Sequence, residues 1–183
     1  MTNYYNDKFK CLKRPNAIAK LKGGPLAPNL TGMALFYQMK DEVLVVTQVY
    51  GMPIKLPDGS PSGFHGYHVH EKGDCTVGDP TNPFLGSGGH YNPLNQPHPF
   101  HAGDLPQLLS VNGPNYGSAY SAVTTNRFNV CDVVGLSLII HQNADDFHTQ
   151  PSGNSGPRWA CGIIRECCYW CWCEYCQWSK NFE

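Results

Sequence analysis

The sequence contains little charge, no long apolar run and almost no helical periodicity, and each of these shortages excludes a class of protein. Charged residues make up 15% of the 183 residues, and the net charge is −1 at pH 7. A nucleic-acid-binding protein would need a basic face, which this balance does not supply. The apolar run at residues 43–49 has the length of a strand and is too short to span a membrane. We therefore expect neither nucleic acid nor a membrane as a partner.

A recognisable targeting segment is also missing. The sequence begins Met-Thr-Asn-Tyr-Tyr-Asn-Asp, which has neither the basic region nor the apolar region of a secretory signal. This absence predicts a cytoplasmic location.

Turn-forming residues are abundant instead, since the chain has 19 glycines and 15 prolines. Short runs typical of strands lie between them, and those at 31–38 and 43–50 flank a charged turn and so predict a hairpin. Residues 71–107 and 142–157 show no period of either kind, which predicts two long functional loops. The expected fold is one all-β domain, a Greek-key β-sandwich or barrel of immunoglobulin-like architecture. The other predicted strands are residues 17–21, 64–70, 118–125, 133–141 and 159–164.

All 8 histidines lie between residues 65 and 148, in an ordered arrangement. His68 and His70 are separated by one residue of a predicted strand, so their side chains project from the same face. His141 ends another apolar strand, where a third imidazole can face them. Imidazole nitrogens are ligands that first-row transition metals prefer. The sequence therefore predicts a histidine metal site.

A second set of candidate ligands lies in the first long loop. Three candidate ligands recur at every third residue, His98, His101 and Asp104. This spacing is close enough for one small metal ion to bind all three. His90 lies between the two sets in the sequence and could serve either, or both through its two ring nitrogens. We therefore expect a centre with more than one metal ion.

The 9 cysteines are unevenly spread, and five of them crowd into residues 167–176. Cys131 follows the apolar residues Phe128 and Val130, and we expect it to be a small buried residue. Cys11 has no assigned role.

Four motifs resemble those of the copper/zinc superoxide dismutases, and the resemblance runs from about residue 17 to residue 165. The chain resembles a compact bacterial-type member of that family. The resemblance divides the chain into an N-terminal extension (1–16), a dismutase-like domain (17–165) and a Cys/Trp-rich tail (166–183). The motifs are Gly66-Tyr67-His68-Val69-His70-Glu71, Gly89-His90-Tyr91-Asn92-Pro93, His101-Ala102-Gly103-Asp104-Leu105 and Ala160-Cys161-Gly162-Ile163-Ile164.

The resemblance implies two metal ions that share one ligand, His90. It also implies that Asp145 links a copper ligand to a zinc ligand, and that His65 is a structural hydrogen-bonding residue. His148 matches no residue of the family, and we expect it at the surface of a loop. The implied copper ligands are His68, His70, His90 and His141, and the implied zinc ligands are His90, His98, His101 and Asp104.

The implied activity is the dismutation of superoxide anion to oxygen and hydrogen peroxide, with copper cycling between Cu(II) and Cu(I). His90 and Arg158 would be catalytic, the first by carrying a proton and the second by attracting the anionic substrate. The resemblance further implies a disulfide between Cys75 and Cys161, which would tie the first long loop to the last strand. It leaves a homodimer open, because the family includes both monomers and dimers.

Two features depart from the family pattern. The stretch from His98 to His101 is much shorter than in animal members, so we expect zinc binding to be more affected than copper binding. The tail contains Cys171-Trp172-Cys173, which resembles the Cys-x-Cys element of the copper chaperone for superoxide dismutase. Soft-metal binding, aromatic packing or oligomer contact, and a segment without function are the other interpretations of the tail.

The alternative function is therefore a non-catalytic copper-binding or copper-chaperone-like protein that uses this tail. A dismutase-like structural domain that holds only zinc is a second alternative. A complete set of copper ligands together with Arg158 favours the enzyme over both, because neither alternative needs them.

Overall fold

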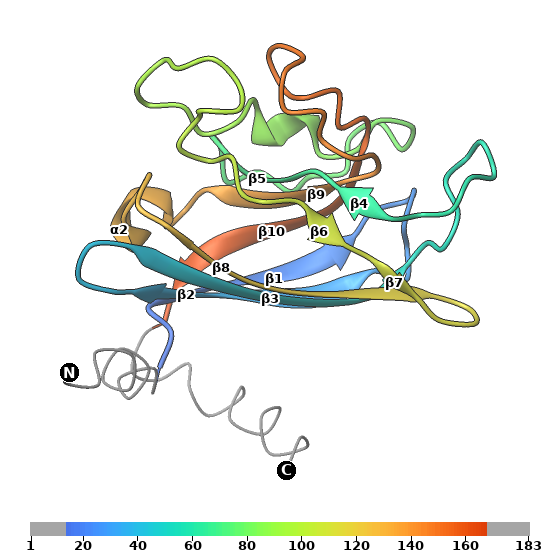
Figure 1. Cartoon of the computed structure of the whole chain (residues 1–183), viewed down its shortest axis with the longest axis horizontal. Helices are drawn as coiled ribbons and strands as arrows, with labels where there is room; N and C mark the ends of the chain where they lie inside the picture. The colour runs from blue at the N-terminus through green and yellow to red at the C-terminus, as the bar shows by residue number, and fades with distance from the viewer. Residues whose placement is uncertain (1–13, 168–183) are drawn as a thin grey trace, which may run out of the picture.

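A computed structural model describes residues 14–167, drawn in colour in Figure 1. Cys11 and the cysteines at 168, 171, 173 and 176 lie outside the described residues, so the hypotheses about the tail stay predictions. The domain limits at residues 17 and 165 stay predictions as well.

The regular secondary structure of the described chain is almost entirely β, as the sequence predicted, with two short helical turns. Those turns are η1 (Leu85–Ser87) and α2 (Val130–Val133). The strands are β1 (Ala17–Gly23), β2 (Thr31–Gln38), β3 (Val43–Met52), β4 (Phe64–His65), β5 (Tyr67–His70), β6 (Leu108–Leu109), β7 (Val111–Asn112), β8 (Gly117–Thr125), β9 (Ser137–His141) and β10 (Arg158–Glu166).

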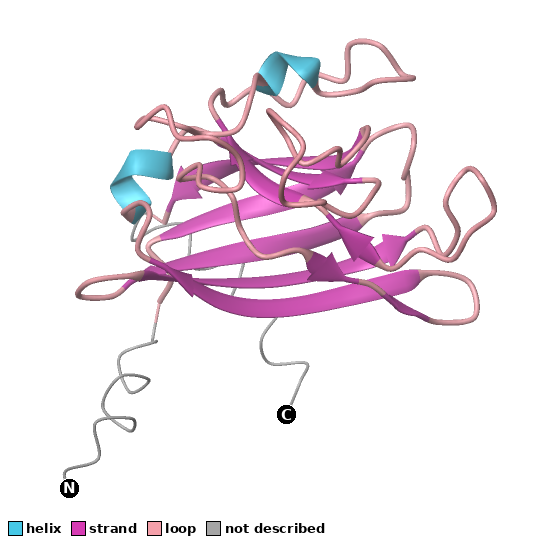
Figure 2. Ribbon diagram, turned by 45° about the horizontal axis from the view of Figure 1, so that its top comes forward, coloured by secondary structure: helices cyan, strands magenta, loops and turns pink. Residues whose placement is uncertain are grey.

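Eight of these strands form one antiparallel sheet in the order β5-β9-β10-β1-β2-β3-β8-β7, and β4 pairs with β6. The predicted hairpin is confirmed, since Thr31–Gln38 pairs with Val43–Met52. The sheet curls on itself, with the loops gathered on one side of it (Figure 2). Residues 71–107 and 142–157 both lie above β5 and β9, which places the two predicted long loops over the histidine-bearing strands (Figure 1). The Greek-key β-barrel prediction is confirmed.

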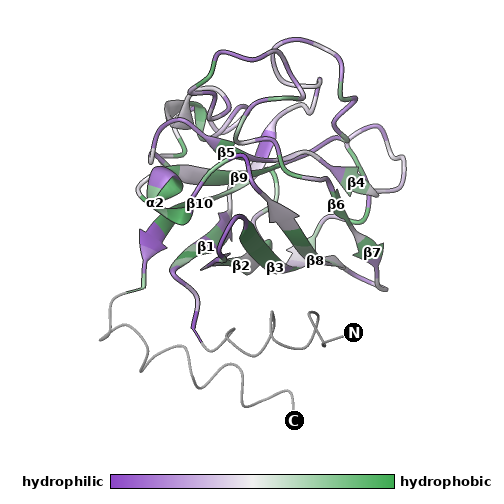
Figure 3. Cartoon of the chain, turned by 60° about the vertical axis from the view of Figure 1, so that its left-hand side comes forward, coloured by the Kyte–Doolittle hydropathy of each residue, from purple (hydrophilic) through white to green (hydrophobic). Residues whose placement is uncertain are grey.

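Alternation of apolar and polar residues places the core inside the curl. In β1, Ala17, Ala19 and Leu21 are buried while Lys20 and Lys22 are exposed. This is the two-residue period of a strand with one face in the core and one in water. Figure 3 shows the same division, with hydrophobic residues concentrated in the strands.

Strands β5 and β9 are buried on both faces because the long loops cover their outer side. Leu138 and Ile140 pack in the main core, whereas Ile139 packs on the opposite face against Phe84 and Cys161. That second cluster includes the disulfide Cys75–Cys161, which has a Cα–Cα separation of 5.6 Å and links residues 86 apart in the sequence. The predicted disulfide is therefore confirmed, and it fastens the first long loop to β10.

The start of one predicted strand and the predicted environment of one cysteine were wrong, both near the helical turn α2. Residues 133–136 do not belong to a strand, because α2 ends at Val133 and β9 begins only at Ser137. Cys131 is exposed, not buried. The helical period turns Val130 and Val133 into the core and leaves Cys131 outside.

Within residues 14–167, no helix is both long enough and apolar enough to cross a membrane.

Candidate metal centre

Two groups of four buried ligand side chains meet beneath the long loops, and His90 belongs to both. Within each group the ligand atoms all lie within 4.8 Å of one another. All seven ligands predicted from the sequence are therefore brought together. The strand group comprises His68, His70, His90 and His141, and the loop group comprises His90, His98, His101 and Asp104.

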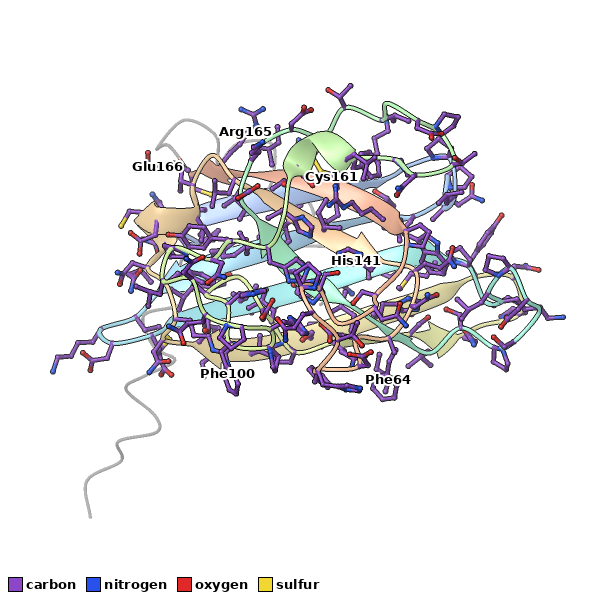
Figure 4. All side chains as sticks on the ribbon, turned by 90° about the horizontal axis from the view of Figure 1, so that it is seen from above. Phe64, Phe100, His141, Cys161, Arg165 and Glu166 are labelled. Atoms are coloured by element: carbon purple, nitrogen blue, oxygen red, sulfur yellow. A yellow bond between two sulfur atoms is a disulfide. The ribbon has the colours of Figure 1, made fainter. Side chains whose placement is uncertain are left out.

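The strand group is positioned by sheet register. Tyr67 and Val69 of β5 point into the main core, so His68 and His70 point to the opposite face, toward the loops. β9 runs antiparallel beside β5 and ends at His141, which Figure 4 shows near the middle of the face covered by the loops.

Backbone bridges bring the loop ligands to the same strand. His90 is bridged to His70, and Asp104 is bridged to His68. These contacts attach two points of the first loop to β5. They explain how one imidazole, His90, can take part in both groups.

In the strand group, every outward ring nitrogen is occupied, which leaves the inward ones as electron-pair donors. His70 Nδ1 donates to the Gly88 carbonyl over 2.9 Å, and His141 Nδ1 donates to the Gly156 carbonyl over 3.0 Å. Their Nε2 atoms then carry no proton, yet they lie only 3.3 Å apart. Two lone pairs held this close indicate a site built for a cation.

Asp145 ties the two groups together, as the family resemblance implied. Its Oδ2 accepts from His68 Nε2 over 2.6 Å, and its Oδ1 accepts from His98 Nε2 over 2.9 Å. Each histidine is thereby left with a bare Nδ1 directed into its own group. One carboxylate thus fixes the ring orientation of one ligand from each group.

Among residues 14–167, three buried side-chain nitrogens have no hydrogen-bond partner, and all three belong to the predicted ligands. They are His68 Nδ1, His90 Nε2 and His98 Nδ1. A buried polar atom without a partner is costly, so its presence calls for an explanation. A metal ion satisfies such atoms, and the donor sets fit: four imidazoles suit copper, and three imidazoles with one carboxylate suit a structural zinc ion.

Burial keeps three rings of the strand group, those of His68, His70 and His141, free of protons, which compete with metals for imidazole nitrogen. It lowers the pKa of His141 to about 3, and it lowers the pKa of His68 and of His70 well below the usual range, with help from the neighbouring imidazoles. At neutral pH these rings are therefore neutral and able to bind.

The carboxylate of the loop group stays ionised. Burial acts to raise the pKa of Asp104, but the hydrogen bond with His90 and the nearby imidazoles together hold that pKa below its ordinary value. Asp104 Oδ1 lies 2.7 Å from His90 Nδ1, and Asp104 Oδ2 lies 3.1 Å from His98 Nδ1. Asp104 Oδ2 also lies 3.3 Å from His101 Nδ1 and accepts from the backbone N–H of His101 over 3.0 Å. The carboxylate is thus held among all three imidazoles of its group.

Arg158 is a cation beside the strand group and interacts electrostatically with His70 and His141. It pairs with His141 across β9 and β10, at a register shift in the ladder. Its guanidinium donates to the carbonyls of Phe84 and Gly88, the second over 2.7 Å. The Gly88 carbonyl also accepts from His70, so the arginine and a ligand of the strand group share one acceptor.

The remaining histidines lie where the sequence led us to expect them. His65 is buried and donates through Nδ1 to the carbonyls of His141 and Gln142, while its Nε2 lies 2.9 Å from Ser62 Oγ. His148 is on the surface, with 81% of its side chain exposed.

Sequence reasoning missed the residues that support Asp145. Gln107 donates through Nε2 to the Asp145 carbonyl over 2.8 Å. Gly153 has φ +64°, and a Cβ there would lie 2.0 Å from Asp145 Oδ1 and 2.7 Å from His98 Nε2. Only glycine leaves room for the carboxylate bridge at this point. Neither residue belongs to a periodic pattern, so no signal in the sequence could have found it.

The comparisons with known proteins agree with this geometry. The family model of copper/zinc superoxide dismutase matches residues 30–164. The superoxide dismutase-like protein YojM of Bacillus subtilis is 39% identical over 131 aligned residues, in a match that covers 62% of this chain and 63% of that protein. A Cu-Zn superoxide dismutase of Deinococcus radiodurans is 37% identical over 123 residues, covering 58% of this chain and 66% of that enzyme. The chain thus spans about two thirds of the length of these curated relatives.

A second such enzyme and a solved structure extend the match. The Cu-Zn superoxide dismutase of Haemophilus ducreyi is 38% identical over 138 residues, with 67% of each chain covered. The crystal structure of the clock protein EA4 superposes with a TM-score of 0.66 at 28% identity, covering 84% of this chain and 96% of that one. Fold, ligand groups and sequence agree, and the chain belongs to the copper/zinc superoxide dismutase family.

Proposed function

We propose that the protein is a superoxide dismutase, which converts two superoxide anions and two protons into one molecule of oxygen and one of hydrogen peroxide. The observation that carries the proposal is the placement of His90. Its Nδ1 lies 2.7 Å from Asp104 in the loop group, while its Nε2 points into the strand group and has no partner. A single imidazole shared by two buried ligand groups suits a centre with two linked metals.

We assign copper to the strand group (His68, His70, His90 and His141) and zinc to the loop group (His90, His98, His101 and Asp104). When bound, copper supplies one-electron oxidation and reduction of superoxide, while zinc, which has a single oxidation state, supplies a fixed positive charge.

His90 is the residue that can carry a proton to the product. Its Nε2 is a buried nitrogen without a protein partner, so it can bind a proton there and release it again. Its Nδ1 stays with Asp104 during that exchange, which keeps the ring in place. The superoxide anion that becomes hydrogen peroxide therefore receives this proton from a nitrogen whose position is fixed.

Arg158 is the residue that attracts and orients the substrate. It is half-buried beside His141, and the carbonyls of Phe84 and Gly88 hold its guanidinium. Burial lowers the pKa of Arg158, but an arginine remains protonated at neutral pH. A fixed cation beside the strand group favours a small anion over neutral molecules.

The test is the decay of superoxide, followed by stopped flow, on protein loaded with copper and zinc. We expect a second-order rate near the diffusional ceiling of about 10⁸–10⁹ M⁻¹ s⁻¹, which known dismutases reach. His141→Ala should abolish the activity because it removes a strand-group nitrogen. The surface variant His148→Gln is the matched control and should keep the full rate. Absence of decay in protein that carries both metals would refute the proposal.

The copper-chaperone alternative depends on the tail, which lies outside the described residues. A double substitution, Cys171→Ser with Cys173→Ser, should leave dismutation intact if the enzyme is the function. A zinc-only domain is disfavoured because the strand group is complete and contains His141.

A homodimer and a cytoplasmic location remain proposals. An exposed apolar pair supports the first: Phe64 and Leu109 face each other across β4 and β6 with 55% and 50% of their surfaces exposed. Light scattering on the full chain measures the oligomeric state directly.

A further inference from the structure

The short link between His98 and His101 is held by an arginine from a distant part of the chain. Arg127 follows β8, and its Nη1 is a donor to the carbonyls of Pro99, His101 and Asp104 over 2.9, 3.3 and 3.4 Å. All three carbonyls belong to the segment that carries the loop-group ligands. Hydrogen bonds from a charged donor are about twice as strong as those between neutral groups.

A second polar side chain holds the backbone of the link, whereas the side chain in the middle of the link does not anchor it. Phe100 is 61% exposed and points away from the body of the molecule, so its side chain does not anchor the link (Figure 4). On the other side Gln150 pairs with the backbone of His98, accepting from its N–H over 2.9 Å and donating to its carbonyl over 2.7 Å. The link is thus held through its backbone by two polar side chains.

The next residues are attached differently. Gly103 donates its N–H to the Tyr91 carbonyl over 2.8 Å, and Leu105 donates to the carbonyl of Tyr67 in β5 over 3.3 Å. From residue 103 onward the loop is therefore held by backbone hydrogen bonds to β5 or to Tyr91 of the same loop. Arg127 acts on the part that precedes these ties through the carbonyls of Pro99 and His101. Its longest contact, to the Asp104 carbonyl, lies among these ties.

Arg127 can act in this way because its own backbone is fixed. Its N–H donates to Thr125 Oγ1 over 3.2 Å, and the next residue, Phe128, is buried in the main core. The guanidinium therefore extends from an anchored point toward the loop.

We propose that Arg127 is a positioning residue for the loop group, holding the backbone of residues 99–104 in the shape that brings His98, His101 and Asp104 to one zinc ion. The inference rests on the proposed function, because it takes the loop group as the zinc site. It also accounts for how so short a link can serve that site: the arginine supplies the restraint that a longer loop would supply through its own contacts.

A role through charge and a role through position predict opposite effects on zinc affinity when Arg127 is removed. A guanidinium near a zinc ion repels it, so if Arg127 acted only through its charge, removing it would tighten zinc binding. If Arg127 holds the carbonyls, removing it weakens zinc binding because the ligands are no longer pre-arranged. The direction of the change therefore identifies the role.

The experiment measures zinc affinity by competition with a chromophoric chelator, and the geometry of the loop group by the visible spectrum of Co²⁺ bound in place of zinc. In Arg127→Ala we expect the zinc dissociation constant to rise by about 10-fold or more, and the intense absorption of tetrahedral Co²⁺ to weaken. Arg127→Lys retains a cation that can reach one carbonyl, and it should recover part of both signals. The copper affinity of the zinc-free protein should be unchanged.

Arg165→Ala is the matched control, because Arg165 lies on β10 at the opposite edge of the molecule from Phe100 (Figure 4). Zinc binding that is equally tight or tighter in Arg127→Ala would overturn the inference while leaving the proposed function intact. If the wild-type chain binds neither zinc nor Co²⁺ at the loop group, the proposed function fails and the inference fails with it. Should Arg127→Ala not fold, Arg127→Lys must still show weaker zinc binding than the wild type, or the inference is wrong.

Discussion

The two ligand groups are built from the same kinds of side chain but on different supports. Three members of the strand group, His68, His70 and His141, come from adjacent paired strands. Three members of the loop group, His98, His101 and Asp104, come from one loop segment that contains no strand. The first group takes its geometry from the backbone ladder of the sheet, whereas the second takes it from contacts between side chains and loop backbone.

This difference predicts where the centre is robust and where it is fragile. A sheet register cannot shift slightly, because a slip by one residue would turn His68 and His70 into the core. A loop held by Arg127, Gln150 and Asp145 can shift slightly when any one contact is lost. We therefore expect copper binding to tolerate distant changes better than zinc binding does.

The largest effect should come from removing one ligand from each group in turn. His70→Ala should reduce dismutation to the background rate while the protein still binds one zinc ion. His101→Ala should weaken zinc binding, yet retain copper and a measurable fraction of the activity, because the strand group is intact. Metal content after dialysis and superoxide decay measure the two outcomes. The comparison breaks down if His101→Ala loses copper as readily as His70→Ala does.

A smaller effect should follow from Gly153→Ala, which places a methyl group against the bridge between Asp145 and His98. We expect zinc affinity to fall by about 10- to 100-fold, the usual result of disturbing a residue that orients a ligand. Gly59→Ala is a matched control, because Gly59 also has positive φ, +84°, but a Cβ there meets nothing within 4 Å. The backbone strain is similar in both variants, so equal zinc affinities would show that the bridge does not orient His98.

The smallest effect concerns the metal-free protein, where the buried rings of the strand group oppose folding in acid. The pKa of His141 is about 3 in the folded state because of burial, against about 6.5 when unfolded. Below pH 6.5 the unfolded chain therefore binds a proton that the folded chain does not, and stability falls as the pH decreases toward 3. Each such histidine lowers the free energy of unfolding by about 1.4 kcal/mol for each pH unit of acidification in this range.

Urea unfolding of the metal-free protein between pH 7.5 and 4.5 measures this slope. His141→Gln should reduce it by about 1.4 kcal/mol per pH unit. His148→Gln, at the exposed position, should not. An identical slope in the wild type and in His141→Gln would show that His141 is not held neutral by its burial.

The sequence predicted the strand group better than the supports of the loop group, and the reason is physical. Alternation in a strand has a period of two, so the one-residue spacing of His68 and His70 is enough to place both side chains on a shared face. Asp145 and Arg158 could be assigned only through the resemblance to a family, since neither lies in a periodic pattern.

The residues that shape the loops left no such signal. Gly153 is needed because of a local positive φ, and Gln107, Gln150 and Arg127 act through single bonds to distant backbone. The burial of Cys131 was predicted wrongly because it lies in a four-residue helix that is too short to recognise from sequence. That helix turns the neighbouring valine side chains into the core and leaves Cys131 exposed. Strands of two residues, such as β6 and β7, were missed for the same reason.

The Asp145 bridge has a consequence for how the two metals are acquired. Its two oxygens restrain His68 and His98 together, so the ion that arrives first fixes a ring that belongs to the other site. We expect the second ion to meet a more restrained ligand and therefore to bind more tightly, which would be positive cooperativity without any change of fold. Linkage requires the benefit to be mutual: whatever factor zinc adds to the affinity for copper, copper adds to the affinity for zinc. The order of loading in the cell would then depend on which ion is supplied first, and the fully loaded state would be favoured over either half-loaded one.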